Sequence, residues 1–239
     1  MRIKYLHTWN FSAKEAINLQ KKLAANVKFT PLKKPPKLVA GLDCAFTKDN
    51  KRIIAAVVVI KLPDFELIEQ KTTVRKLAFP YIPGLLSFRE APACIAAAAK
   101  LKNTPDLFLV DGQGIAHPRR LGLAAHLGLF LDKPTVGRAK SRLVGSYKPP
   151  PPQKAAYTLL EDKLRITCIS AAVQQTTDQQ VIGAVVRTRT NVKPVFVSVG
   201  NRCLLQDAIN ITLACTTKYR LPEPVRLAHQ LVSRLRLQA

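Results

Sequence analysis

Apolar residues recur along the chain in short runs that alternate between strand-like and helix-like spacing. Residues 38–46 (LVAGLDCAF), 52–62 and 64–75 predict three consecutive strands, which would form an antiparallel meander. Residues 12–27 have helical spacing and begin with a Ser12–Glu15 capping box. Three prolines in residues 28–37 exclude a helix there and predict an extended connector.

The stretch 107–137 has the most informative pattern. An apolar run ends in the pair Asp111–Gly112, which predicts a buried strand with Asp111 at its carboxyl end, the edge where ligands gather in open α/β sheets. Residues 119–131 predict a helix with one buried face, and residues 134–137 a short strand that leads to Lys140. An Asp-Gly pair is also a common turn signal, so this pattern leaves both interpretations of Asp111 open.

The remaining elements follow the same alternation. Ser87 is expected to cap a helix over 87–101, with Glu90 in its first turn, where pairing with Ser87 in a capping box is the simpler interpretation. The proline run 149–152 predicts a polyproline spacer at the tip of a hairpin. Further strands are expected at 157–160, 164–169, 180–189 and 195–198, and helices at 204–218 and 224–237.

This order of elements predicts an α/β fold with an RNase H-like mixed sheet, an antiparallel meander plus parallel strands flanked by helices, in a single domain over residues 1–239. In such a sheet the first and fourth strands are neighbours, so Asp43 and Asp111 would lie side by side with Glu90 reaching over them. Three converging carboxylates need a positive counter-charge, and Mg²⁺ prefers oxygen ligands of this kind.

The charge of the chain indicates its partner. Lys and Arg number 38 against 15 Asp and Glu, a net charge of +23 that favours a polyanion over a membrane surface or a ribosomal-type role. No apolar stretch is long enough to span a bilayer, so we expect a soluble cytoplasmic protein. The five cysteines form no CxxC pair and are expected to be reduced core residues without a zinc site.

Residues 79–89 (FPYIPGLLSFR) form an unusual loop, because loops are normally polar and this one is apolar and stiffened by proline. One interpretation is a loop tucked against the core. The other is a rigid wedge whose aromatic tip enters a base stack, since a side chain pushed between bases must be held firmly.

Five segments together resemble the endonuclease V family of repair nucleases. They are GLDCAF at Gly41, PYIPGLLSFRE at Pro80, DGQGIAHPRRLGLAAHLG at Asp111, PTVGRAKSRLVGSY at Pro134 and YRLPEPVRLAH at Tyr219. They occur in the order of that family and span the chain from the first predicted strand to the last helix. The resemblance implies an RNase H-like fold and Mg²⁺-dependent cleavage, with Mn²⁺ as a substitute, one nucleotide beyond hypoxanthine on its 3′ side.

The resemblance also implies roles for individual residues. Asp43, Glu90, Asp111 and His229 would form the metal site, Lys140 would be the active-site lysine and His117 would lie beside the cleaved backbone. The strand-separating wedge would comprise Pro80, Tyr81, Ile82 and Pro83, and the base pocket Gly84, Leu86 and Gly112. The implied partner of this expected monomer is hypoxanthine-containing DNA or inosine-containing RNA. The alternatives are another RNase H-like nuclease of the resolvase or transposase type, and a basic nucleic-acid-binding module without catalysis.

Overall fold

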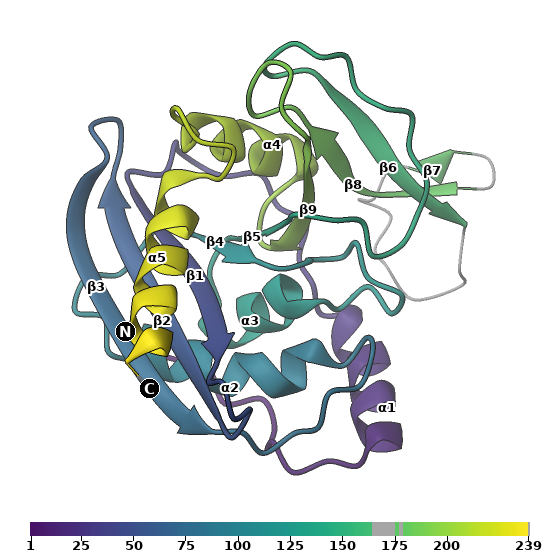
Figure 1. Ribbon diagram of the computed structural model, residues 1–239. Coiled ribbons are helices and arrows are strands. Elements are labelled where there is room, and N and C mark those ends of the chain that lie inside the picture. Colours follow the sequence, from purple (N-terminus) through teal and green to yellow (C-terminus); the bar gives the residue numbers. More distant parts are fainter. Residues whose placement is uncertain (164–174, 177–178, 239) are drawn as a thin grey trace.

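The computed structural model describes residues 1–163, 175–176 and 179–238, and a mixed β-sheet runs through them (Figure 1). The described residues contribute nine strands, in the order β3-β2-β1-β4-β5-β9-β8-β6, with β7 paired to β8. Their bounds are β1 (Leu38–Phe46), β2 (Arg52–Lys61), β3 (Glu66–Lys76), β4 (Leu107–Asp111), β5 (Thr135–Ala139), β6 (Tyr157–Lys163), β7 (Gln175–Thr176), β8 (Gln179–Val186) and β9 (Val195–Asn201).

The predicted meander and the predicted neighbouring first and fourth strands are confirmed. Strands β1, β2 and β3 pair antiparallel, β4 lies parallel to β1, and β5 lies parallel to β4. From β5 onward the sheet turns antiparallel through β9, β8 and β6. The RNase H-like mixed sheet expected from the order of elements is therefore present.

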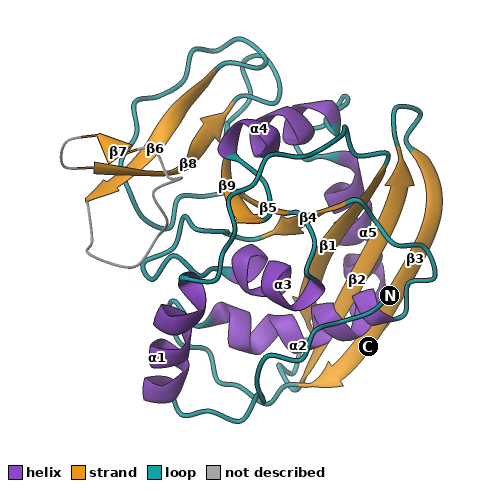
Figure 2. Ribbon diagram, turned by 180° about the vertical axis from the view of Figure 1, so that it is seen from behind, coloured by secondary structure: helices purple, strands orange, loops and turns teal. Residues whose placement is uncertain are grey.

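Helices cover both faces of the meander, which explains why β2 is apolar at nearly every position. Helix α5 (Glu223–Leu237) lies on one face and α2 (Leu86–Ala99) on the other, as the two opposite views show (Figures 1 and 2). Ile54 and Val58 belong to the core beneath α5, whereas Ile53 and Val57 belong to the core beneath α2. Because side chains alternate along a strand, one continuous apolar run supplies both cores.

The other helices are α1 (Ala13–Ala24), α3 (Leu123–Leu131) and α4 (Leu205–Ala214). The capping box of α1 is confirmed, since the Ser12 and Glu15 side chains each hydrogen-bond to the other residue's backbone. The prediction that the helix after Asp111 begins at residue 119 and buries one face is wrong. Helix α3 begins at Leu123 and all nine of its residues are buried, because it packs against α2, β4, β5 and β9 together.

The prediction that Ser87 caps α2 is also wrong. The N-cap is Leu85, and Ser87 lies inside the helix with its hydroxyl 3.1 Å from Nδ1 of His126. Glu90 is therefore beyond the first turn and forms no capping box with Ser87. The turn at Gly84, which has a φ of +77°, lets the helix begin earlier than the serine suggested.

Two expectations near β6 have different outcomes. The proline run at 149–152 lies, as expected, in the connection between two segments that pair antiparallel, because Ser146 and Glu161 form an isolated β-bridge with two backbone hydrogen bonds. The backbone carbonyls of Pro150 and Pro151 accept hydrogen bonds from the Arg187 side chain. The strand expected at 164–169 lies outside the described residues.

Among the described helices, none is long and apolar enough to cross a membrane.

Candidate metal and nucleic-acid site

Asp43 and Asp111 meet at one edge of the sheet because of strand register. Leu42 of β1 pairs with Val110 of the parallel strand β4, so the residue that follows each of them lies at the same level. Asp43, Asp111 and His229 each offer a ligand atom, and these atoms lie within 4.8 Å of one another. We call these three residues the carboxylate site.

Helix α5 brings His229 to this edge. Its first turn packs so closely on β1 that a Cβ atom at Gly41 would lie 2.1 Å from the carbonyl carbon of Pro224. A side chain at position 41 would push the helix away, which explains the glycine. Further along the helix, Nδ1 of His229 donates a hydrogen bond to Oδ2 of Asp43 over 2.7 Å.

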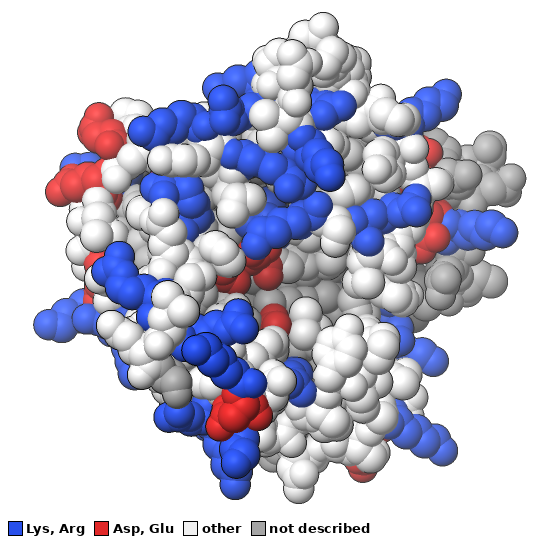
Figure 3. Space-filling view, viewed as in Figure 1, with Lys and Arg blue, Asp and Glu red and all other residues white. Residues whose placement is uncertain are grey.

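Two cations face the carboxylate of Asp111. Nζ of Lys140 lies 3.2 Å from Oδ2, and a guanidinium nitrogen of Arg138 lies 3.4 Å from Oδ1. Strand β5 positions both cations. Arg138 pairs in register with Asp111, and Lys140 comes directly after the last residue of the strand. On this face of the molecule, acidic groups lie in a central hollow and Lys and Arg side chains surround it (Figure 3). An acidic floor with a basic rim suits a phosphodiester backbone approaching a bound cation.

The acids near this site are hard to ionise in the metal-free protein. Burial, reinforced by the charge of Asp111, raises the pKa of Asp43 to about 6. Burial also raises the pKa of Glu90 to about 8, although the Cys44 thiol hydrogen-bonds to its carboxyl and acts in the opposite direction. Glu90 lies near Asp43 and Asp111 but outside the group of three. Both shifts come mainly from burial, to which the mutual repulsion of the clustered carboxylates adds.

The donor set fits a divalent metal. Two carboxylates and one imidazole, close enough to share an ion, suit Mg²⁺ or Mn²⁺, which favour oxygen donors. A divalent ion at Asp43 and Asp111 would also favour their charged forms. Asp43, Asp111 and His229 would hold the ion, with Glu90 next to them.

A second cluster holds the carbonyl oxygen of Gly84. It receives hydrogen bonds from the side chains of Gln20 at 3.1 Å, His117 at 3.0 Å and Arg119 at 2.6 Å. Nδ1 of His117 in turn accepts the backbone N–H of Arg119. Burial lowers the pKa of His117 to about 3, so this imidazole is neutral. Both ring nitrogens of His117 are therefore engaged, one by the carbonyl of Gly84 and the other by the backbone N–H of Arg119.

This cluster anchors the wedge loop, which we define as residues 80–84. Tyr81 is 70% exposed, so the interpretation of a loop tucked against the core is wrong for its tip. Ile82, by contrast, packs against the cluster of Phe79, Leu85 and Phe88. The loop is thus fixed at its base and exposed at its aromatic tip.

The residues expected to surround a base lie near this anchor and near the sheet edge. Leu86 is 38% exposed at the start of α2. Gly112 follows Asp111, and its N–H donates to the backbone carbonyl of Arg138 over 2.9 Å. Gly84 has a φ of +77°, a backbone conformation that other residues adopt only with strain, which explains why a glycine occupies the anchored position.

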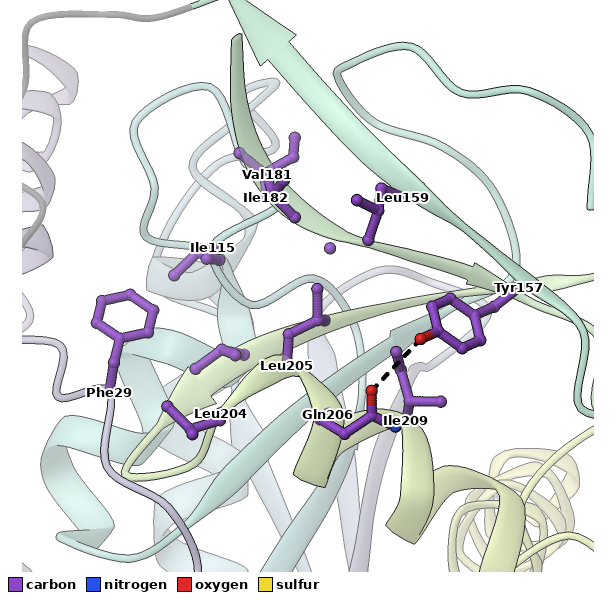
Figure 4. A pocket seen from close by; sticks show the side chains of 12 residues that line it. Phe29, Ile115, Tyr157, Leu159, Val181, Ile182, Leu204, Leu205, Gln206 and Ile209 are labelled. Carbon is purple, nitrogen blue, oxygen red and sulfur yellow. Dashed lines mark hydrogen bonds between the residues drawn. The ribbon is translucent and has the colours of Figure 1, made fainter. Parts of the chain in front are cut away.

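A separate apolar cavity of about 430 Å³ lies between α4 and β8. Phe29, Tyr157, Leu159 and Ile209 line it, and Tyr157 donates a hydrogen bond to Gln206 across it (Figure 4). None of the residues expected at the metal site, wedge or base pocket is among its described lining residues.

Sequence reasoning missed two residues near the site. Gln20 belongs to the helix predicted over 12–27 and Arg138 to the segment PTVGRAKSRLVGSY, and neither was given a role from the sequence. Gln20 and Arg138 are both 0% exposed. Their only local signal is a polar residue within an otherwise apolar segment, which is clear for Arg138 in the strand TVGRA.

The mixed sheet and a carboxylate group at the edge of its first and fourth strands define an RNase H-like nuclease. The family profile described as Endonuclease V matches residues 21–230. An endonuclease V of Alkalilimnicola ehrlichii is 45% identical over 97% of this chain and 96% of its own length. The chain belongs to the endonuclease V family, and it is a hydrolase of the endonuclease class.

Solved structures give the same result. The endonuclease V of Bacillus subtilis superposes with a TM-score of 0.87 at 32% identity, over 99% of this chain and 98% of its own. That of Ciona intestinalis, in complex with a 23mer DNA containing an inosine followed by a ribo-adenosine, superposes with a TM-score of 0.74 at 28% identity, over 95% and 99%.

Proposed function

We propose that this protein is a Mg²⁺-dependent endonuclease that recognises hypoxanthine in nucleic acid and hydrolyses the phosphodiester bond one nucleotide beyond it on the 3′ side. The observation that carries the proposal is the convergence of Asp43, Asp111 and His229 in a chain of the endonuclease V family. The complex of the Ciona relative with inosine-containing DNA supports the choice of base.

The carboxylate site is the hydrolytic centre in this proposal. A divalent ion there would activate water and neutralise charge that develops on the phosphate oxygens. Asp43, Asp111 and His229 would hold that ion, with Glu90 next to them. Lys140, whose side chain is 45% exposed, reaches from Asp111 toward the substrate and stabilises negative charge on the phosphate.

The wedge loop serves base extrusion. Pro80 and Pro83 restrict the backbone on both sides of Tyr81 and Ile82, so the exposed ring of Tyr81 fills the gap that an extruded base leaves. His117 was expected beside the cleaved backbone, but its two ring nitrogens are engaged by the carbonyl of Gly84 and the N–H of Arg119, so we assign it the positioning of this loop in place of a catalytic role. The backbone at Gly84, Leu86 and Gly112 surrounds the extruded hypoxanthine.

The net charge of +23 supports binding to the nucleic-acid backbone. The substrate is hypoxanthine-containing DNA or inosine-containing RNA, bound by a cytoplasmic monomer that folds as one domain over residues 1–239. Neither the carboxylate site nor the wedge loop needs a second copy of the chain, since the described residues of one chain supply both.

The proposal is tested with two end-labelled strands that differ only in hypoxanthine against adenine at one position. We expect cleavage of the hypoxanthine strand alone, with Mg²⁺ or Mn²⁺ and not with EDTA, at one bond on the 3′ side. Equal cleavage of both strands would indicate a nuclease of another specificity, such as a resolvase-type enzyme. Binding without any cleavage would indicate a non-catalytic nucleic-acid-binding protein.

A further inference from the structure

The side chain of Arg138 is the most anomalous polar group next to the carboxylate site. It is 0% exposed in the middle of the sheet, between Asp111 on β4 and Val197 on β9. None of its three side-chain nitrogens makes a hydrogen bond to any described residue. Its ion pair is with Asp111, over 3.4 Å. A buried charge without hydrogen bonds is expensive, so it calls for a specific explanation.

A second buried arginine shows that the fold can satisfy such a group. Arg120 is 1% exposed, and its guanidinium donates to Gln180, to the carbonyl of His117 and to Asp162, at 3.1, 2.9 and 2.9 Å. Arg138 has no comparable set of acceptors. Burial lowers the pKa of the Arg138 guanidinium, whereas the carboxylates of Asp111 and Asp43 act in the opposite direction and favour its charged form. The nearby guanidinium of Arg220 carries a like charge that repels Arg138. The carboxylates of Asp111 and Asp43 are therefore the groups that favour a charged side chain at this buried position.

We propose that Arg138 is a resident counter-cation of the carboxylate site, which remains at Asp111 with or without a bound metal and lowers the affinity of the site for divalent cations. The inference rests on the proposed function, because it takes Asp43 and Asp111 as metal ligands. A fixed positive charge repels an arriving divalent ion. It also supports the metal-free fold, where it offsets part of the repulsion between two carboxylates.

Lys140 contacts the same carboxylate and behaves differently. Its side chain is 45% exposed, so it can swing away from Oδ2 of Asp111 when a metal arrives. Arg138 is enclosed by strands on both sides and cannot leave. Charges exposed to solvent are screened by salt, whereas buried charges are screened much less. The two cations can therefore be distinguished by ionic strength.

The test is the dissociation constant of Mn²⁺, measured by calorimetry or by the EPR signal of free Mn²⁺ in the absence of nucleic acid. We expect Arg138→Gln and Arg138→Met to bind Mn²⁺ about ten-fold more tightly or better, since ten-fold is only about 1.4 kcal/mol and a unit charge in a buried site exceeds that. The gain should persist at high salt. Lys140→Gln should give a smaller gain that salt removes.

Two controls separate charge from folding. Arg138→Lys keeps the charge and should bind Mn²⁺ with an affinity close to that of the unchanged protein. Arg120→Met removes a buried arginine that pairs with Asp162 and should leave the affinity unchanged. If Arg138→Gln folds, as judged by circular dichroism, and binds Mn²⁺ no more tightly than the unchanged protein, the inference is wrong. If the unchanged protein binds no Mn²⁺, or Asp111→Asn binds it equally well, the proposed function fails instead.

Discussion

The carboxylate site and the wedge loop hold their polar groups in opposite ways. In the carboxylate site, Asp111 contacts only mobile or unsatisfied cations among the described residues, and burial keeps the pKa of Asp43 at about 6. In the wedge loop, the single carbonyl of Gly84 accepts hydrogen bonds from three side chains. In the first region the partners of Asp111 are two cations at 3.2 and 3.4 Å, of which one is exposed and the other makes no hydrogen bond to a described residue, whereas the carbonyl in the second region is saturated with hydrogen bonds.

The difference follows from what each region has to do. A group that binds metal and phosphate must exchange partners during the reaction, so it cannot already be saturated. A loop that enters a base stack gains from rigidity, because any freedom of the tip reduces the binding energy that stacking supplies. Substitutions in the two regions should therefore affect different measurements, metal-dependent chemistry in one and strand separation in the other.

The largest effect is expected for Asp111→Asn. Cleavage should fall about a thousand-fold or more, because a charged ligand of a preorganised electrostatic site is lost. Affinity for the strand should change little, since the basic charges remain. Single-turnover cleavage and filter binding measure the two quantities. Asp64→Asn makes the same change at an exposed position and should retain full activity; substantial turnover by Asp111→Asn in Mg²⁺ would contradict the metal assignment.

Lys140→Ala should slow the chemical step by about a hundred-fold, the scale of one charge-stabilising group. Lys28→Ala removes an exposed lysine and should alter only the salt dependence of binding. Single-turnover rates at saturating enzyme distinguish the two variants. If both merely weaken binding to the same extent, Lys140 has no role in the chemistry.

Tyr81→Ala should weaken binding to hypoxanthine-containing duplex by about ten-fold, because base stacking on an aromatic ring contributes about 1 to 3 kcal/mol. The loss on single strands should be smaller, since they have less stacking to break. Tyr5→Ala removes another exposed tyrosine and is the matched control. A lowered melting temperature with equal losses on both substrates would mean that Tyr81 has a structural role.

Gln20→Leu tests the anchor of the wedge loop. Losing its hydrogen bonds to Gly84, Leu121 and Arg119 should reduce cleavage of duplex about ten-fold or more, because each net hydrogen bond contributes about 1 kcal/mol. Mn²⁺ affinity should be unaffected, because the side chain lies away from the carboxylate site. A weaker metal affinity in this variant would show that the two regions are not independent.

The last prediction concerns stability without metal. The folded-state pKa values of Asp43 and Glu90, about 6 and about 8, lie above the ordinary values of 3.8 and 4.5. Their contribution to stability is complete below the ordinary values and is lost as the pH rises through 6 and then 8. In EDTA the melting temperature should therefore fall between pH 5 and pH 8.5. Glu90→Gln should flatten the upper part of this fall, and an unchanged profile would contradict the raised pKa of Glu90.

The sequence predicted the frame of the site well. The bounds of β1 are those expected, and the position of Asp111 at the end of β4 followed from an apolar run that meets Asp-Gly. Such features depend on local periodicity and strand order, which the sequence carries directly. The adjacency of Asp43 and Asp111 needed only the pairing of the first and fourth strands.

Features that depend on contacts between distant segments could not be predicted in this way. Ser87 has the composition of a cap, but its hydroxyl is used by His126 from another helix. His117 is held by Gly84, 33 residues away. The burial of Arg138 depends on β9 packing beside β5, a pairing that no local pattern specifies. These long-range partners decide which polar residues are structural and which remain available for chemistry.

The most direct test of the carboxylate site is anomalous diffraction from crystals of the protein soaked in Mn²⁺. We expect one or more Mn²⁺ peaks about 2.1 Å from carboxylate oxygens of Asp43 and Asp111, with Lys140 withdrawn from Asp111 and Arg138 still beside it. Absence of Mn²⁺ from these carboxylates at saturating concentration, or an ion bound elsewhere while Lys140 stays at Asp111, would contradict the assignment of this edge of the sheet as the metal site.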